Sequence, residues 1–291
     1  MFNIMKNSKW CALISVAIIL AGIVCLVVNG GFATDIDFSG GCKMVVSIKD
    51  AADISEGTIK NAVESVEGIE YYGVVKMDGD LMQIKTSSIE SGAEGETLYN
   101  AVKAAAGLKG ESYESCENIS PSLSRDLLTN ALIALVVAIV LILIYICIRF
   151  EFAAAIAAII ALLHDTLIML SAYAIFRFTV NSTFVAAILT IVGYSVNATI
   201  IIFDRVRENR KFAGKLGFTE VCEKSIHQTI RRTINTTVTT LVALICLYIL
   251  GAESIKMFAI PLIIGVIAGT YSSVCISAPL WNFVRGTTKK K

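Results

Sequence analysis

Residues 193–210 read GYSVNATIIIFDRVRENR, and this stretch indicates what kind of fold the chain adopts. An apolar run that carries Gly193, Ser195 and Asn197 gives way abruptly to charged residues, beginning at Asp204. Polar groups inside a bilayer are costly unless they face protein or water, so their presence points to function. The charges mark where a helix leaves the membrane. The stretch therefore predicts a membrane-spanning helix that ends at an interface.

The whole chain has the composition of a membrane protein. Of its 291 residues, 55% are hydrophobic and 17% are charged, and the mean hydropathy of +0.71 excludes an ordinary soluble domain. Six apolar spans are each near the ~20 residues that cross a hydrocarbon core. They cover residues 10–28, 127–148, 153–176, 184–203, 233–250 and 257–281. The first is expected to be a retained anchor, because residues 27–31 (VVNGG) make a poor cleavage site.

Charge is strongly segregated along the chain. Residues 31–124 contain 16 acidic and seven basic residues, whereas residues 204–232 contain eight basic and four acidic ones. The basic segments, including the tail at Lys289–Lys291, all fall on one side of a six-span topology, which predicts cytoplasmic termini and an outer acidic domain. The predicted division is 1–30 (N-terminus and first span), 31–124 (outer domain), 125–203 (second to fourth spans), 204–232 (cytoplasmic basic loop) and 233–291 (last two spans and basic tail).

The outer segment has the pattern of one small α/β domain. Strands are expected at residues 43–49, 71–77, 81–86 and 111–119, and helices at 56–66 and 96–106. Residues 78–80 (DGD) predict a tight hairpin turn, and residues 91–95 (SGAEG) a solvated loop. The order β-α-β-β-α-β is that of the ferredoxin-like motif. The predicted fold is thus an α-helical membrane protein with six transmembrane helices and one small extracytoplasmic ferredoxin-like domain.

Several function classes lack their sequence signatures. The chain has no GxxxxGK[ST] loop, no Rossmann glycine fingerprint, no nucleophile elbow and no zinc-binding helix. Cysteine and histidine spacing predicts no metal site, so we expect neither an enzyme nor a cofactor. Any work would then draw on an ion gradient or a partner. Cys42 and Cys116 are the two cysteines of the outer domain, and the sequence leaves open whether they bond.

His164 and Asp165 form an ionisable pair near the middle of the third span. At ~1.5 Å per residue, they lie some 18 Å from the start of that span. A pair at such depth must be partnered or hydrated, and an ion or proton relay is the first hypothesis. A buried polar clasp that orients neighbouring helices is the alternative.

Small residues in the fourth and sixth spans predict close helix packing. Gly193 and Ser195 permit close approach in the fourth span, as Gly265 and Gly269 do in the sixth. Asn197 is expected to hydrogen-bond across helices.

Two further motifs have both a functional and a structural interpretation. Arg232 lies at the start of the fifth span. Its side chain either turns inward to pair with an acid or anchors the helix at the membrane–water interface. Gly40 and Gly41, within the motif DIDFSGG at residues 35–41, form either a simple turn or a hinge between the outer domain and the membrane part.

In combination, these motifs resemble the SecF family, the six-span subunits of bacterial protein export. The matching segments are residues 37–41 (DFSGG), Tyr145 with 149–151 (RFE), 164–165 (HD), 193–209, 228–233 and 269–273 (GTYSS). The resemblance implies one half of an RND-type unit in the bacterial cytoplasmic membrane. Its implied partners are SecD, the SecYEG channel with the SecA motor, an unfolded preprotein and the lipid bilayer, with no nucleic acid. The implied activity is use of a proton or sodium gradient to promote export.

The chain departs from this family at two places. Ala198 stands where the family commonly has an aspartate, which is thought to join an arginine matching Arg232 in ion conduction. Residues 119–121 (ISP) replace a common glycine-containing sequence. Because alanine carries no proton, SecD supplies the carboxylate, Asp165 takes over its role, or coupling is altered. Two rival functions stay open. One is an RND-type exporter of small molecules or lipids, and the other is a non-conducting scaffold for SecD.

Overall fold

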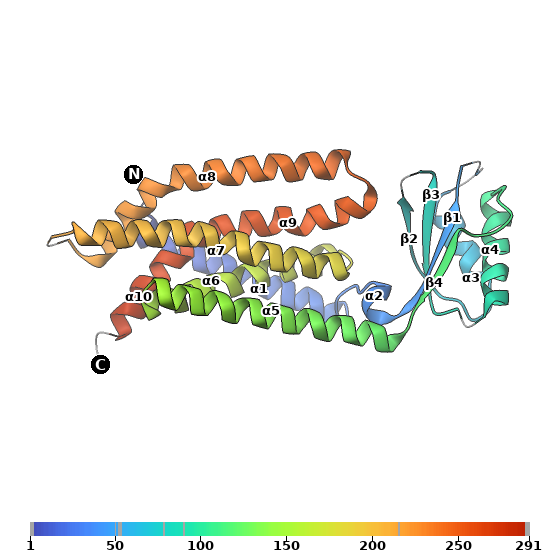
Figure 1. Cartoon of the computed structure of the whole chain (residues 1–291), viewed down its shortest axis with the longest axis horizontal. Coiled ribbons are helices and arrows are strands. Elements are labelled where there is room, and N and C mark those ends of the chain that lie inside the picture. The colour runs from blue at the N-terminus through green and yellow to red at the C-terminus, as the bar shows by residue number, and fades with distance from the viewer. Residues whose placement is uncertain are drawn as a thin grey trace.

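The chain folds into a bundle of long helices and a separate α/β domain at one end of it (Figure 1). This computed structural model describes residues 3–49, 51, 54–77, 79–89, 91–214 and 216–288. Figure 1 shows both chain termini at the end of the bundle that lies away from the α/β domain. An even number of spans brings the chain back to its starting side, so this placement agrees with six crossings.

Six helices are long and apolar enough to cross a membrane, and each contains most of one predicted span. They are α1 (Ile4–Val28), α5 (Pro121–Arg149), α6 (Phe152–Phe176), α7 (Ser182–Lys211), α8 (Phe218–Leu250) and α9 (Glu253–Ser272), the last continued by a π-helical turn (Ser273–Ser277) and α10 (Ala278–Thr288). The predicted fold class is confirmed. α6 and the α9–α10 unit are the most buried, so they form the centre of the bundle.

Residues 204–232, the predicted cytoplasmic basic loop, are mostly helical in the structure. α7 continues to Lys211 and α8 begins at Phe218, which leaves residues 212–217 as the connection. Polar contacts stabilise these extensions beyond the apolar spans. Arg205 donates to Glu208 one turn along α7 and to Gln228 on α8, each at 2.6 Å.

The α/β domain has the order β1 (Gly41–Ser47), α3 (Glu56–Glu64), β2 (Tyr71–Met77), β3 (Leu81–Thr86), α4 (Gly92–Ala106) and β4 (Ser115–Ile119). Its sheet has the antiparallel order β2-β3-β1-β4, which confirms the ferredoxin-like prediction. Helices α3 and α4 cover the face of the sheet that points away from the bundle (Figure 1). Met44, Ile84 and Leu98 are fully buried in the core between these layers.

The local predictions within this domain hold in part. Gly79 and Asp80 have positive φ angles of 74° and 57°, as a tight hairpin turn requires, while Asp78 lies outside the described residues. The predicted loop at residues 91–95 is wrong, because the Ser91 side chain accepts from the Glu94 N–H and starts α4 at Gly92. The tail at Lys289–Lys291 also lies outside the described residues.

Glycines set the closest helix contacts in the bundle. A Cβ added at Gly265 would lie 2.5 Å from Ile191, and one at Gly269 would lie 3.0 Å from Ser195 Cβ. Gly22, which sequence reasoning did not single out, is tighter still, because a Cβ there would overlap Ser171 Cβ and lie 2.6 Å from Ser171 Cα. A Cβ at Gly193 would meet no atom within 4 Å among the described residues. The close approach expected at Gly193 is therefore not made within this chain.

Replacing Gly22 with alanine should push α1 away from α6. The new methyl group would meet the backbone of Ser171, which cannot rotate aside, so we expect Gly22→Ala to cost about 1–3 kcal/mol of folding free energy. Thermal unfolding of the purified full chain in detergent measures this loss. Gly193→Ala is the matched control, since its methyl group enters open space. Equal unfolding temperatures for both variants would contradict the packing argument.

Candidate functional site

A buried carboxylate lies at the centre of the bundle. Asp165 on α6 is 1% exposed. Its Oδ1 lies 2.9 Å from His164 Nδ1, and its Oδ2 accepts hydrogen bonds from Ser195 Oγ at 2.5 Å and Ser272 Oγ at 2.8 Å. Both carboxylate oxygens are thus satisfied, as burial of an acid in a membrane protein demands.

The polar chain continues from the histidine to α1. His164 Nε2 lies 2.8 Å from Ser15 Oγ, and Ser15 in turn donates to the Cys11 carbonyl at 3.3 Å. The Tyr271 ring stacks on the His164 ring, with centroids 6.0 Å apart, and its hydroxyl donates to the same carbonyl at 2.7 Å. We call Ser15, His164, Asp165, Ser195 and Ser272 the bundle cluster. It joins residues of α1, α6, α7 and α9.

The bundle cluster alternates groups that both donate and accept protons. A hydroxyl, an imidazole and a carboxylate that are hydrogen-bonded one after another provide a path along which a proton can pass. The same bonds also hold four helices in register, so relay and clasp are compatible uses of one geometry. His164 lines an apolar cavity of about 560 Å³, and none of the described lining residues is charged.

Two residues predicted for this site lie elsewhere. Asn197 and Arg232 are exposed on α7 and α8, and neither side chain makes a hydrogen bond or ion pair among the described residues. Ser195, expected only to allow close packing, does lie against Gly269 and also donates to Asp165. Ser15 was missed, because a single serine in an apolar run carries little signal until its partner is known. Ser272 lies in the matching segment 269–273, but its hydrogen bond to Asp165 was not predicted.

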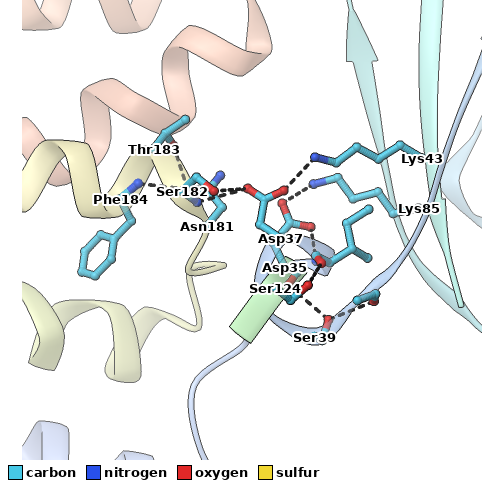
Figure 2. A network of polar contacts seen from close by, with 12 residues as sticks. Asp35, Asp37, Ser39, Lys43, Lys85, Ser124, Asn181, Ser182, Thr183 and Phe184 are labelled. Carbon is cyan, nitrogen blue, oxygen red and sulfur yellow. Dashed lines mark hydrogen bonds and ion pairs between the residues drawn. The ribbon is translucent and has the colours of Figure 1, made fainter. Parts of the chain in front are cut away.

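A second polar cluster joins the α/β domain to the bundle (Figure 2). Asp35 and Asp37 flank the start of α2 (Ile36–Ser39) and point toward two lysines of the sheet. Lys85 Nζ lies 2.7 Å from Asp35 Oδ2, and Lys43 Nζ lies 2.7 Å from Asp37 Oδ1. Asp35 and Lys85 are both under 10% exposed, so each charge depends on the other for compensation.

Asp37 also binds the start of a membrane helix. Its Oδ2 accepts from the N–H of Ser182 at 3.1 Å and from the Ser182 hydroxyl at 2.7 Å, at the N-terminus of α7, where negative charge is favoured. Burial raises the pKa of Asp37, but the hydrogen bonds from Lys43 and Ser182 outweigh that effect and hold the pKa below its usual value. We call Asp35, Asp37, Lys43, Lys85 and Ser182 the root cluster.

The glycine pair follows the root cluster directly. Gly40 and Gly41 have φ angles of 80° and 146°, which side chains other than glycine rarely adopt. A Cβ at Gly41 would overlap the Thr86 carbonyl oxygen, so this position also requires glycine for space. The segment before it is held by the bundle, because Asp35 N–H donates to Val180 O at 2.9 Å. In this conformation the proposed hinge is thus held by backbone contacts at both of its ends.

Known proteins share both the sequence and the shape of this chain. The family model "Protein export membrane protein SecD/SecF, C-terminal" matches residues 100–287. The protein translocase subunit SecF of Alicyclobacillus acidocaldarius is 35% identical over 100% of this chain and 95% of its own length. The protein translocase subunit SecDF of Bacillus subtilis is 36% identical over 98% of this chain and 38% of its own.

A solved structure agrees. The crystal structure of SecDF from Thermus thermophilus, described as a translocon-associated membrane protein, has a TM-score of 0.82 and 27% identity, with 100% of this chain and 39% of that chain covered. The chain therefore spans about two fifths of the SecDF proteins and nearly the full length of the SecF protein. On these matches, the chain belongs to the SecD/SecF family of protein-export membrane proteins.

Proposed function

We propose that the chain is a SecF-type subunit of the protein translocase, which pairs with SecD and uses an ion gradient to promote protein export. It would act in the bacterial cytoplasmic membrane on unfolded preproteins that SecYEG and SecA have moved. Both termini would be cytoplasmic, with the α/β domain outside. The observation that carries the proposal is the bundle cluster, because a buried carboxylate and imidazole in series suit proton passage. Its relatives are named as translocase subunits, which favours this function over a small-molecule or lipid exporter.

Pairing with SecD, as the second half of the unit, explains why polar faces of two helices are left uncovered in this chain. One exposed face of α7 and one of α8 carry small and polar residues at helical spacing. These are Ala186, Thr190, Gly193 and Asn197 on α7, and Arg232, Asn235, Thr236 and Thr239 on α8. Exposed to lipid, such groups are costly, whereas small and polar residues favour helix–helix contact in membranes. In the fused SecDF relatives, this chain matches about two fifths of the length. This supports SecD as the partner that covers these faces of α7 and α8.

Ala198 belongs to this side of α7. It is half-buried next to the exposed Asn197, and the α7 residue that donates to Asp165 is Ser195, not Ala198. A carboxylate at position 198 would thus belong to the contact with the partner. We infer that the SecD half supplies any acid needed there, and that Asp165 keeps its own hydrogen bonds regardless of the residue at 198.

One helix connects the two clusters. α7 carries Ser182, which binds Asp37 in the root cluster, and Ser195, which binds Asp165 in the bundle cluster. The two serines are 13 residues apart, or about 20 Å along a helix. In the proposed mechanism, a change in the protonation of Asp165 shifts α7, and α7 transmits the shift to the root of the outer domain at Gly40 and Gly41.

Asp165→Asn should abolish the part of export that depends on the gradient. Asparagine keeps the size of the side chain but cannot take up or release a proton, so the subunit would assemble without coupling. The measurement is the export rate of a slow-maturing preprotein in a deletion strain complemented with each variant, with and without an uncoupler. We expect Asp165→Asn to export at the rate of the deletion strain, and the rescue by the wild-type chain to vanish with the uncoupler.

The matched control is Thr199→Val on the same helix. Thr199 is also buried, but its hydroxyl lies 3.2 Å from Ser273 Oγ and is not part of the bundle cluster. We expect Thr199→Val to keep gradient-dependent export. If Asp165→Asn rescues as well as the wild type and the rescue ignores the uncoupler, the chain is a scaffold for SecD and the ion path lies outside it.

Asp37→Asn should loosen the attachment of the outer domain in a pH-dependent way. Because the folded pKa of Asp37 lies below its ordinary value of 3.8, its contribution is full at higher pH and is lost as pH falls through the folded pKa. We expect Asp37→Asn to cost about 1–2 kcal/mol at neutral pH. In thermal unfolding of the full chain in detergent, the gap between wild type and variant should be constant down to about pH 5 and then close.

Asp204→Asn serves as the control for this measurement. Asp204 pairs with Arg149 at 3.1 Å, but both side chains are more than 40% exposed, where ion pairs contribute little. A gap of the same size for Asp204→Asn, or a gap for Asp37→Asn that does not narrow between about pH 5 and pH 1, would contradict the role given to Asp37.

A further inference from the structure

Cys42 and Cys116 meet in the core of the α/β domain. Cys42 lies on β1 and is fully buried, and Cys116 lies on β4 and is half-buried against the same core. Their sulfur atoms are 3.0 Å apart. The two residues are 74 positions apart in sequence, so the sheet alone brings them together.

The strand register explains why the two side chains approach each other. Cys42 pairs with Asn118, and Cys116 pairs with Met44. The cysteines are therefore diagonal neighbours that project from the same face of the sheet. The 3.0 Å between the sulfur atoms is about 1 Å longer than the ~2.05 Å of an S–S bond, so the thiols are already in contact and a small movement of the two side chains would allow the bond to form.

We propose that Cys42 and Cys116 form a disulfide bond that fixes the edge strand β4 to β1. The proposal rests on the proposed function in one respect, which is that the domain lies outside the cytoplasm, where disulfides form and persist. The oxidant is a disulfide of another thiol, RSSR. Cys116 thiolate attacks one sulfur of RSSR and releases RS⁻. Cys42 then loses its proton and attacks Cys116 Sγ, which releases the second RS⁻. The two cysteines lose two electrons and two protons, and RSSR becomes two RSH.

Burial decides the order of these steps. Cys116 is reachable from solvent, so it can meet an external disulfide. Burial and the neighbouring Cys116 raise the pKa of the Cys42 thiol, which makes it a poor first nucleophile. Once Cys116 is in a mixed disulfide, Cys42 needs no access to solvent, because its target sulfur is already in contact.

The position of the bond gives it a mechanical role. Cys42 follows the Gly40–Gly41 pair that enters the domain, and β4 leads through Ser120 into α5. β4 is a five-residue edge strand, paired on one side with β1. A pull transmitted along the chain therefore enters the domain through β1 and leaves it through β4. A covalent bond between them would keep β4 from peeling off the sheet.

The test uses the full chain in native membranes. Acid quenching, denaturation and alkylation with a maleimide, without reductant, are followed by peptide mass spectrometry. We expect peptides containing Cys42 and Cys116 to be linked and to take up maleimide only after dithiothreitol. Cys116→Ser should leave Cys42 free to react. Cys222→Ser is the matched control, because Cys222 is equally buried but lies on α8, and it should leave the linked peptide unchanged.

A second measurement reports the mechanical effect. Hydrogen exchange of the β4 amides in the wild-type chain should become roughly tenfold faster or more after reduction, and that change should be absent in Cys116→Ser. If both cysteines of the quenched wild type are unlinked and take up maleimide without dithiothreitol, the proposal is overturned, whichever side of the membrane the domain occupies. Labelling of Ser112→Cys by an impermeant maleimide on intact cells tests the outside placement separately, so the two failures are distinguishable.

Discussion

The fold depends on one constraint, which is that a carboxylate inside a bilayer must find all of its hydrogen-bond partners within the protein. Asp165 is almost fully buried, and its partners come from its own helix, from α7 and from α9, while His164 extends the set to α1. These four helices are therefore positioned by polar contacts as well as by packing. The close approach of Gly269 to Ser195 belongs to the same arrangement, since a larger residue would displace a donor of Asp165.

A second buried charge solves the same problem at the other end of the bundle. Asp35 is neutralised by Lys85 on β3, and Asp37 is shared between Lys43 on β1 and the N-terminus of α7. The domain is thus attached through charge-assisted bonds of defined geometry rather than through a flexible linker alone. Because α7 contributes to both clusters, movement of this helix changes both at once. In the proposed mechanism, that shared helix couples the membrane part to the α/β domain.

The sequence predicted the elements better than the contacts between them. Apolar runs near ~20 residues and strand alternation depend on local pattern, so the six spans and the order β-α-β-β-α-β were recoverable. His164 and Asp165 stood out because charge is rare in apolar surroundings. The hydrogen bonds of Ser15, Ser272 and Ser182 were not predicted, because they depend on which helices become neighbours. Residues 91–95 were misjudged as a loop, since glycine and alanine conceal a helix start that Ser91 caps.

The exposed Asn197 and the half-buried Ala198 show that one polar segment of the sequence has two different faces in the structure. One face serves the bundle cluster and the other is left uncovered. Ser195 faces the interior of the bundle, and Asn197, two residues later, faces away from it. On a helix, residues two positions apart point in nearly opposite directions, so one segment of α7 serves the internal cluster and the uncovered face at the same level. The half-buried Ala198 thus lies beside the uncovered face of α7. It leaves the hydrogen bonds of Asp165 intact, and a chain with Ala198 retains an ionisable group in the membrane.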